Sequence, residues 1–112
     1  MTHTEKTTTA KRITKEEKKL LQEKTNRESL ALAIGTLENI QTDYTYKTNR
    51  TSKRIIRGSL DLLQHDDRNV GLSIRAANAI SVLVTMSQDR RMESHIRTML
   101  WQVVSNLEAI RE

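Results

Sequence analysis

The sequence predicts an all-α fold: an antiparallel four-helix domain of two repeated αα-hairpins, preceded by a basic N-terminal arm that is flexible or helical. The 112 residues include no Pro and only three Gly, so the tight turns that a β-sandwich needs are scarce. Aromatic residues make up 3% of the chain and Phe is absent, which leaves an aliphatic core. Apolar residues also recur at helical spacing in four segments, and the length suits one domain.

The N-terminal part is predicted to be a basic tail over residues 1–27, partly disordered, with the helical domain following over residues 28–112. The tail carries eight Lys and Arg against four Glu, and has almost nothing apolar before Leu20. Residues 1–14 are expected to be disordered, because they bury too little surface to offset the entropy of ordering. From Lys15 onward the mixture of Glu and Lys favours a helix.

The first predicted hairpin has two apolar stripes on either side of a polar loop. The first stripe comprises Leu30, Ile34, Leu37 and Ile40, with Ala31 and Ala33. "TDYTYKTN" then breaks the pattern, and Thr48 or Asn49 is suited to cap the next helix. That helix is expected in "RTSKRIIRGSLDLLQ", with a stripe of Ile55, Ile56, Ser59, Leu60, Leu62 and Leu63.

The second predicted hairpin follows the loop "HDDRNVG". Its first helix is expected from about Ser73 to Ser87. The inward residues there are Ile74, Ala77, Ile80, Leu83 and Val84, with Met86 as a further candidate. "QDRRM" turns the chain, and the last helix is expected from about Glu93 to Arg111. Its stripe comprises Ile96, Met99, Leu100, Val103, Val104, Leu107 and Ile110.

An internal repeat relates the two hairpins. "ALAIGTLENIQTD" (31–43) aligns with "ANAISVLVTMSQD" (77–89), so that Ile34 matches Ile80 and Leu37 matches Leu83. After a slightly longer first loop, Ile55, Ile56, Leu60 and Leu63 match Met99, Leu100, Val104 and Leu107. Lys53 matches Arg97 in the same alignment. The repeat favours two similar hairpins packed against each other.

The C-terminal part of the chain resembles an archaeal group of short helical proteins, uncharacterised protein family 0147. The motifs that carry the resemblance are Arg75-Ala76-Ala77-Asn78-Ala79-Ile80, Asp89, Arg97-Thr98, Trp101 and Leu107-Glu108-Ala109-Ile110-Arg111. The match is close over about residues 73–112 and loose over 30–64. The resemblance implies a helical fold and an archaeal, cytoplasmic setting, and it implies no chemistry.

Two departures from the family pattern concern Pro. The family's second turn usually has Pro on either side of an Asn-Met pair, where this chain has Arg90 and Glu93. Its first hairpin usually reads like "VPRNIRRAA", where this chain has "KTNRTSKRII". Both changes keep the helix pattern, but they weaken any function inferred from that turn.

No catalytic, cofactor or metal site is predicted, and a small-molecule substrate is not expected. The absence of Cys excludes disulfides and Cys-based zinc sites, while His3, His65 and His95 are scattered. "HDD" at 65–67 offers oxygen ligands, but acidic residues before a helix are ordinary. No phosphate-binding Gly motif or nucleophile elbow occurs. "AISVLVTM" is too short to span a bilayer, so a cytoplasmic protein without a membrane partner is expected.

The strongest functional signal is a run of cations without acids. Residues 44–57 contain Lys47, Arg50, Lys53, Arg54 and Arg57, of which the last four fall on one helical face opposite the apolar stripe. A Lys-rich tail (Lys11, Arg12, Lys15, Lys18 and Lys19) would stand nearby and add reach. Such a face attracts a polyanion, and Tyr44 and Tyr46 are placed to stack on unpaired bases. An ordinary solvated face is the alternative.

Two functions remain open on the sequence. The first is a non-enzymatic protein that associates with RNA, as an accessory protein of the ribosome. The second is a helical protein–protein interaction module or homodimer with no nucleic-acid role, using Trp101 as partner-binding residue. Trp101 flanks the last stripe, so it is either half-buried in the core or an exposed anchor. Arg75, Arg97 and Glu108 belong either to an exposed binding face or to Arg–carboxylate pairs such as Arg97 with Asp89.

Overall fold

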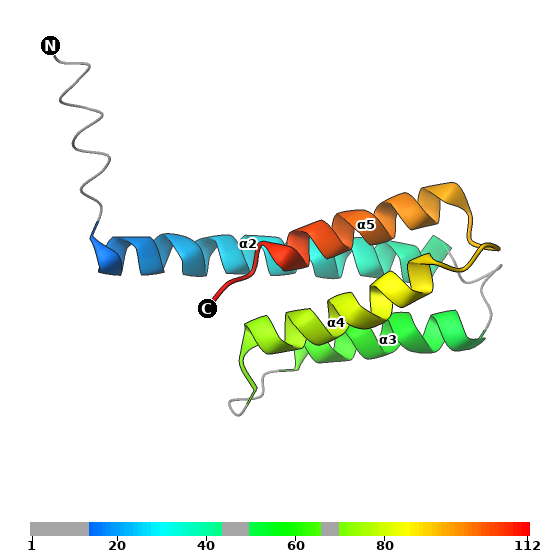
Figure 1. Cartoon of the computed structure of the whole chain (residues 1–112), viewed down its shortest axis with the longest axis horizontal. Coiled ribbons are helices and arrows are strands. Elements are labelled where there is room, and N and C mark those ends of the chain that lie inside the picture. Colours follow the sequence, from blue (N-terminus) through cyan, green and yellow to red (C-terminus); the bar gives the residue numbers. More distant parts are fainter. Residues whose placement is uncertain (1–13, 44–49, 66–69) are drawn as a thin grey trace, which may run out of the picture.

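The computed structural model describes residues 14–43, 50–65 and 70–112, and they form an antiparallel four-helix bundle (Figure 1). The helices are α2 (Lys15–Asp43), α3 (Arg50–Gln64), α4 (Leu72–Ser87) and α5 (Ser94–Glu108). Each packs against the helices before and after it, and α5 closes the ring by returning to α2. The all-α fold of two αα-hairpins predicted from the sequence is therefore confirmed.

The internal repeat is visible in the burial of matched positions. Leu37 in α2 and its counterpart Leu83 in α4 are both fully buried. The matched pairs of α3 and α5, Ile56 with Leu100 and Leu63 with Leu107, are also buried in the common core. The two hairpins therefore present equivalent faces to the core, and their outer faces can be compared position by position.

Helix α2 is longer than the other helices and includes the predicted arm. Thr14, which the sequence placed with the disordered residues, caps it: its Oγ1 accepts a hydrogen bond from the backbone N–H of Glu17 at 3.1 Å. Glu16 and Glu17 in the first turn suit the helix dipole. The helix passes the expected boundary at residues 27 and 28 without a break. Its first part extends beyond the end of α3 and the start of α4 (Figure 1). Residues 1–13 lie outside the described ranges.

The inward face of α4 differs from the prediction. Ile74 and Ala77 were expected to point inward, but both are exposed, Ile74 by 56%. Leu83 and Met86 are buried as predicted, and the other buried residues are Ala76, Ala79 and Ser87. Arg75 is the only charged residue of α4, so charged residues in the sequence do not distinguish the outer face of this helix from its inner face. Helix α4 is thus rotated about its axis relative to the prediction. This rotation agrees with the position of Arg75, whose Nη1 donates hydrogen bonds to the carbonyls of Leu62 and His65 at the end of α3.

Helix α5 ends earlier than predicted, and the C-terminal segment that follows it contacts both α2 and α4. Helix α5 ends at Glu108, and Asn26 of α2 then holds the backbone of Arg111 from both sides. Its Nδ2 donates to the Arg111 carbonyl at 2.7 Å, and its Oδ1 accepts from the Arg111 N–H at 3.0 Å. Glu112 reaches α4, where its Oε1 accepts from the backbone N–H of Ser73 at 2.8 Å. The carboxylate thus caps the start of α4 and passes close to Gly71, where a Cβ would lie 2.8 Å from it.

The Glu112 contact predicts a specific pH dependence of stability. The hydrogen bond from the Ser73 backbone N–H holds the pKa of Glu112 below its usual value of 4.5. A lowered folded-state pKa gives stability that is present above the unfolded pKa and is lost as pH falls through the folded pKa. We expect Glu112→Gln to lower the melting temperature at neutral pH and to reduce the fall in stability below about pH 4.5. Thermal melts from pH 7 to pH 2.5, monitored by circular dichroism, check this. A parallel pH profile for both proteins would contradict it.

Candidate nucleic-acid interface

The four cations predicted to share one face of α3 are all exposed. Arg50, Lys53, Arg54 and Arg57 follow helical spacing on the side opposite the buried Ile56, Leu60 and Leu63, as predicted. We refer to these four residues as the basic face. Across the described residues 50–65, Asp61 is the acid present, and it lies one turn beyond Arg57. The basic face is therefore a solvent-exposed strip of one sign of charge.

The position of this strip is unfavourable for the helix itself. Arg50, Lys53 and Arg54 lie in the first turns of α3, where the helix dipole is positive, and the first turn has no acidic residue. Cations three and four residues apart also repel one another. A binding partner rich in negative charge offsets both the unfavourable interaction with the dipole and the repulsion between the cations, because anions are stabilised at helix N-termini. The arrangement therefore suits polyanion binding better than it suits the stability of α3.

The arm and the basic face do not lie together. Lys15, Lys18 and Lys19 are exposed at the start of α2, whereas α3 begins near the end of α2 (Figure 1). The 29 residues of α2 separate the two clusters by roughly 40 Å. The three lysines also alternate with Glu16, Glu17 and Glu23, so their local charge is largely balanced. The predicted residues Lys11, Arg12, Lys47, Tyr44 and Tyr46 lie outside the described residues.

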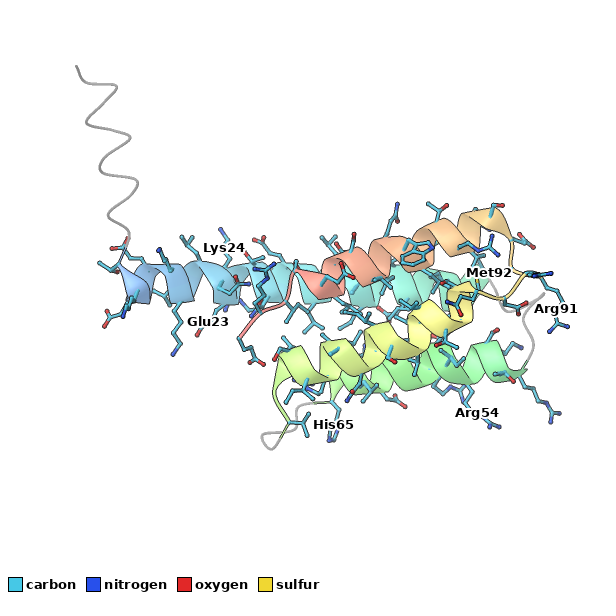
Figure 2. The ribbon with its side chains drawn as sticks, in the orientation of Figure 1. Glu23, Lys24, Arg54, His65, Arg91 and Met92 are labelled. Atoms are coloured by element: carbon cyan, nitrogen blue, oxygen red, sulfur yellow. The ribbon has the colours of Figure 1, made fainter. Side chains whose placement is uncertain are left out.

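The fold instead brings a second pair of cations to the end of the molecule where α3 begins. Arg90 and Arg91 lie in the turn between α4 and α5, and both are exposed. Figure 2 shows Arg91 and Arg54 at this end, opposite Glu23 and Lys24. The sequence predicted only a turn at these residues. Four antiparallel helices of one bundle place alternate turns at the same end, and this topology is the signal that could have identified the pair.

Arg75 and Arg97, which carry part of the family-like motif, have structural roles. The guanidinium of Arg97 donates to the backbone carbonyls of Ser87 at 3.0 Å and Asp89 at 2.9 Å, at the end of α4. Arg75 performs the same task at the end of α3. Arg97 therefore contacts Asp89 through the backbone carbonyl, and not through the Arg–carboxylate pair considered from the sequence. The Asp89 carboxylate accepts from the Arg91 N–H, and this bond lowers the pKa of Asp89.

Trp101 lies on the outer surface of α5 and is 49% exposed. It borders a hollow of about 520 Å³ between α2 and α5. Leu32 of α2 borders the same hollow and is 60% exposed. Trp101 thus satisfies the condition for a partner-binding residue, because a large part of its ring is open to solvent.

The described residues offer little for other chemistry. Within residues 14–43, 50–65 and 70–112, no three His, Asp or Glu side chains lie close enough to hold a metal ion. Asp66 and Asp67 of the "HDD" motif lie outside these ranges. Among the same residues, no helix has the length and apolar character needed to cross a bilayer.

The fold and these surfaces define a small helical-bundle protein with one basic helix face. Comparison with known proteins places it more closely: the chain matches the uncharacterised protein family UPF0147 over residues 15–110 and belongs to that family. The match includes the α2 arm and the first hairpin, beyond the C-terminal part in which the resemblance was close. No solved structure matches the chain.

Archaeal members of the family cover most of the chain. A UPF0147 protein of Sulfurisphaera tokodaii is 34% identical over 78% of this chain and 93% of its own length. One from Aeropyrum pernix is 36% identical over 78% of this chain and 91% of its own. One from Metallosphaera sedula is 34% identical over 78% of this chain and 93% of its own. These names carry no activity.

Proposed function

We propose that this protein is a non-enzymatic, cytoplasmic RNA-associated protein, an accessory of the ribosome, and that the basic face of α3 is its phosphate-binding surface. The observation that carries the proposal is the position of Arg50, Lys53, Arg54 and Arg57. They are exposed on one face of α3 with Asp61 as the acid in the described part of that helix, and three of them lie in its first turns, where their charge opposes folding. Binding to phosphates turns this cost into a gain, because each contact neutralises a cation and releases counterions.

The turn between α4 and α5 extends this surface. Arg90 and Arg91 lie at the same end as the start of α3, so a polyanion that covers the basic face also approaches them (Figure 2). The arm has a smaller role, because the glutamates of α2 offset much of the charge of Lys15, Lys18 and Lys19. The ribosome is proposed as partner because ribosomal RNA offers a dense phosphate surface and contact with phosphates needs no base-reading motif.

The proposal is tested with the purified full chain and archaeal ribosomal RNA in filter-binding titrations at two salt concentrations. Four phosphate contacts correspond to a slope of about −3 in log affinity against log salt. We expect tight binding at low salt and a loss of affinity of roughly 60-fold from 50 to 200 mM salt. Binding too weak to measure at low salt would refute the proposal. In the native cell, capture of the protein should recover ribosomal components that RNase treatment releases.

A further inference from the structure

The outer faces of α3 and α5 hold equivalent positions in the two hairpins but differ in chemistry. Arg57 is the central residue of the 15-residue α3, and Trp101 is the central residue of the 15-residue α5. The repeat that aligns Lys53 with Arg97 also aligns Arg57 with Trp101. At the exposed positions three before, one after and four after the central residue, α3 has Arg54, Gly58 and Asp61, whereas α5 has Thr98, Gln102 and Ser105. The two hairpins therefore share a core but carry different surfaces.

The surface around Trp101 combines a half-exposed ring with an open hollow. In the described structure, the residues that line the 520 Å³ hollow are all uncharged: Leu32, Thr36, Thr98, Trp101, Gln102, Ser105 and Asn106. We refer to these seven residues as the uncharged patch. Leu32 and Trp101 are its large apolar side chains, 60% and 49% exposed. Because the ring and the hollow lie side by side, the Trp101 ring of one copy can pack into the hollow of another.

We propose that the uncharged patch binds a second copy of this chain, about a two-fold axis that passes near Trp101. A two-fold contact joins a surface to itself, so every charge near the axis meets a like charge. Two copies with a net charge of +5 repel each other, and the basic face would add to that repulsion. At the uncharged patch, two copies can approach without placing like charges at the centre. Self-association therefore fits this surface and not its equivalent on α3.

The ends of α5 support the same choice. A two-fold axis across the middle of a helix makes the two copies of that helix antiparallel. Trp101 stands seven residues from both Ser94 and Glu108, so the contact would extend over the whole of α5. It would bring Glu108 of one protomer toward the start of α5 in the other, where the helix dipole is positive. The two ends of α5 are thus of opposite dipole sign where they meet, while the centre is neutral.

The arrangement is compatible with, and independent of, RNA binding. Helix α3 lies diagonally across the bundle from α5, since both pack against α2 and α4. The basic faces of the two copies would therefore remain accessible on the outer sides of the dimer.

Sedimentation velocity and tryptophan fluorescence of the full chain over a dilution series test the inference. We expect a change from twice the 12.9 kDa chain mass to the chain mass on dilution. Trp101 is the single Trp, so its emission should move to longer wavelength over the same range as its ring becomes hydrated. A monomer with constant emission at every concentration would overturn the inference. It would also be overturned if the pure protein stays a monomer and Trp101 becomes buried only when a cell extract is added.

Variants locate the contact. Trp101→Glu should weaken association by at least roughly 30-fold, because it places two carboxylates at the axis. Leu32→Glu, on a different helix, should weaken it too, which guards against a folding defect confined to α5. Arg57→Glu, the equivalent position in α3, should not weaken association, because it lowers the net charge that opposes it. The chain has no Cys, so Gln102→Cys should cross-link to its own copy under mild oxidation, whereas the equivalent Gly58→Cys should not. A dimer that survives both Trp101→Glu and Leu32→Glu would contradict the assignment.

Discussion

Replacing the four cations of the basic face by Gln is expected to weaken RNA binding by roughly 100-fold at low salt and, at the same time, to stabilise the fold. The variant is Arg50→Gln, Lys53→Gln, Arg54→Gln and Arg57→Gln. Binding falls because four phosphate contacts are lost. Stability rises by roughly 1 kcal/mol, because cations are removed from the positive end of α3 and from each other. Most surface changes that impair a function lower stability or leave it unchanged. A fall in RNA affinity together with a rise in stability would therefore distinguish a binding role of the basic face from a general structural effect.

The matched control removes the same charge from the arm. The variant Lys15→Gln, Lys18→Gln, Lys19→Gln and Lys24→Gln has the same net charge as the variant of the basic face. We expect it to lose less than roughly tenfold in affinity, because these lysines lie at the far end of α2 among glutamates. Fluorescence anisotropy with labelled RNA measures both variants, and thermal melts measure their stability. Equal losses from the two variants would indicate that net charge, and not the basic face, determines binding.

The second large effect is expected at Arg97. Arg97→Ala should destabilise the bundle by about 2–3 kcal/mol, because two carbonyls at the end of α4 lose a charged donor. Arg97→Lys should recover only part of this loss, since a single ammonium lacks the planar fork that reaches both carbonyls. RNA affinity should be unchanged once folding is accounted for. Chemical denaturation measures the free energy of unfolding.

Arg91→Ala is the control for Arg97, because its side chain is 84% exposed in the same turn. It should change stability little and weaken RNA binding slightly. If Arg97→Ala leaves stability unchanged but reduces RNA affinity, then Arg97 belongs to a binding face and the structural role assigned to it is wrong.

Helix α3 shows what the sequence could predict. Its apolar residues and its cations separate onto opposite faces, so the stripe and the basic face both follow from spacing alone. Helix α4 shows the limit. With one charged residue in 16, its apolar residues suit two different inward faces, and the sequence selected the wrong one for Ile74 and Ala77. The interactions of Arg75 depend on how α3 ends, which is set by tertiary packing.

The candidate site could be predicted only in part, because spacing along the chain relates residues of one helix and does not relate residues of different elements. Local spacing identified Arg50, Lys53, Arg54 and Arg57, because all four lie on one helix. Arg90 and Arg91 joined them only through the antiparallel topology, and the arm was separated from them by the length of α2. The sequence also left open whether Trp101 was exposed, since it lies at the border of the α5 stripe. In the structure its position on the outer surface of α5 leaves about half of it accessible.

The salt dependence of RNA binding, measured for the unchanged protein and for the four-Gln variant of α3, tests the central claim most directly. If the basic face contacts four phosphates, the slope of log affinity against log salt should become shallower by about 3 in the variant. The arm variant should keep most of the original slope. A slope that is the same in the unchanged protein and in the α3 variant would contradict the claim that this face binds RNA.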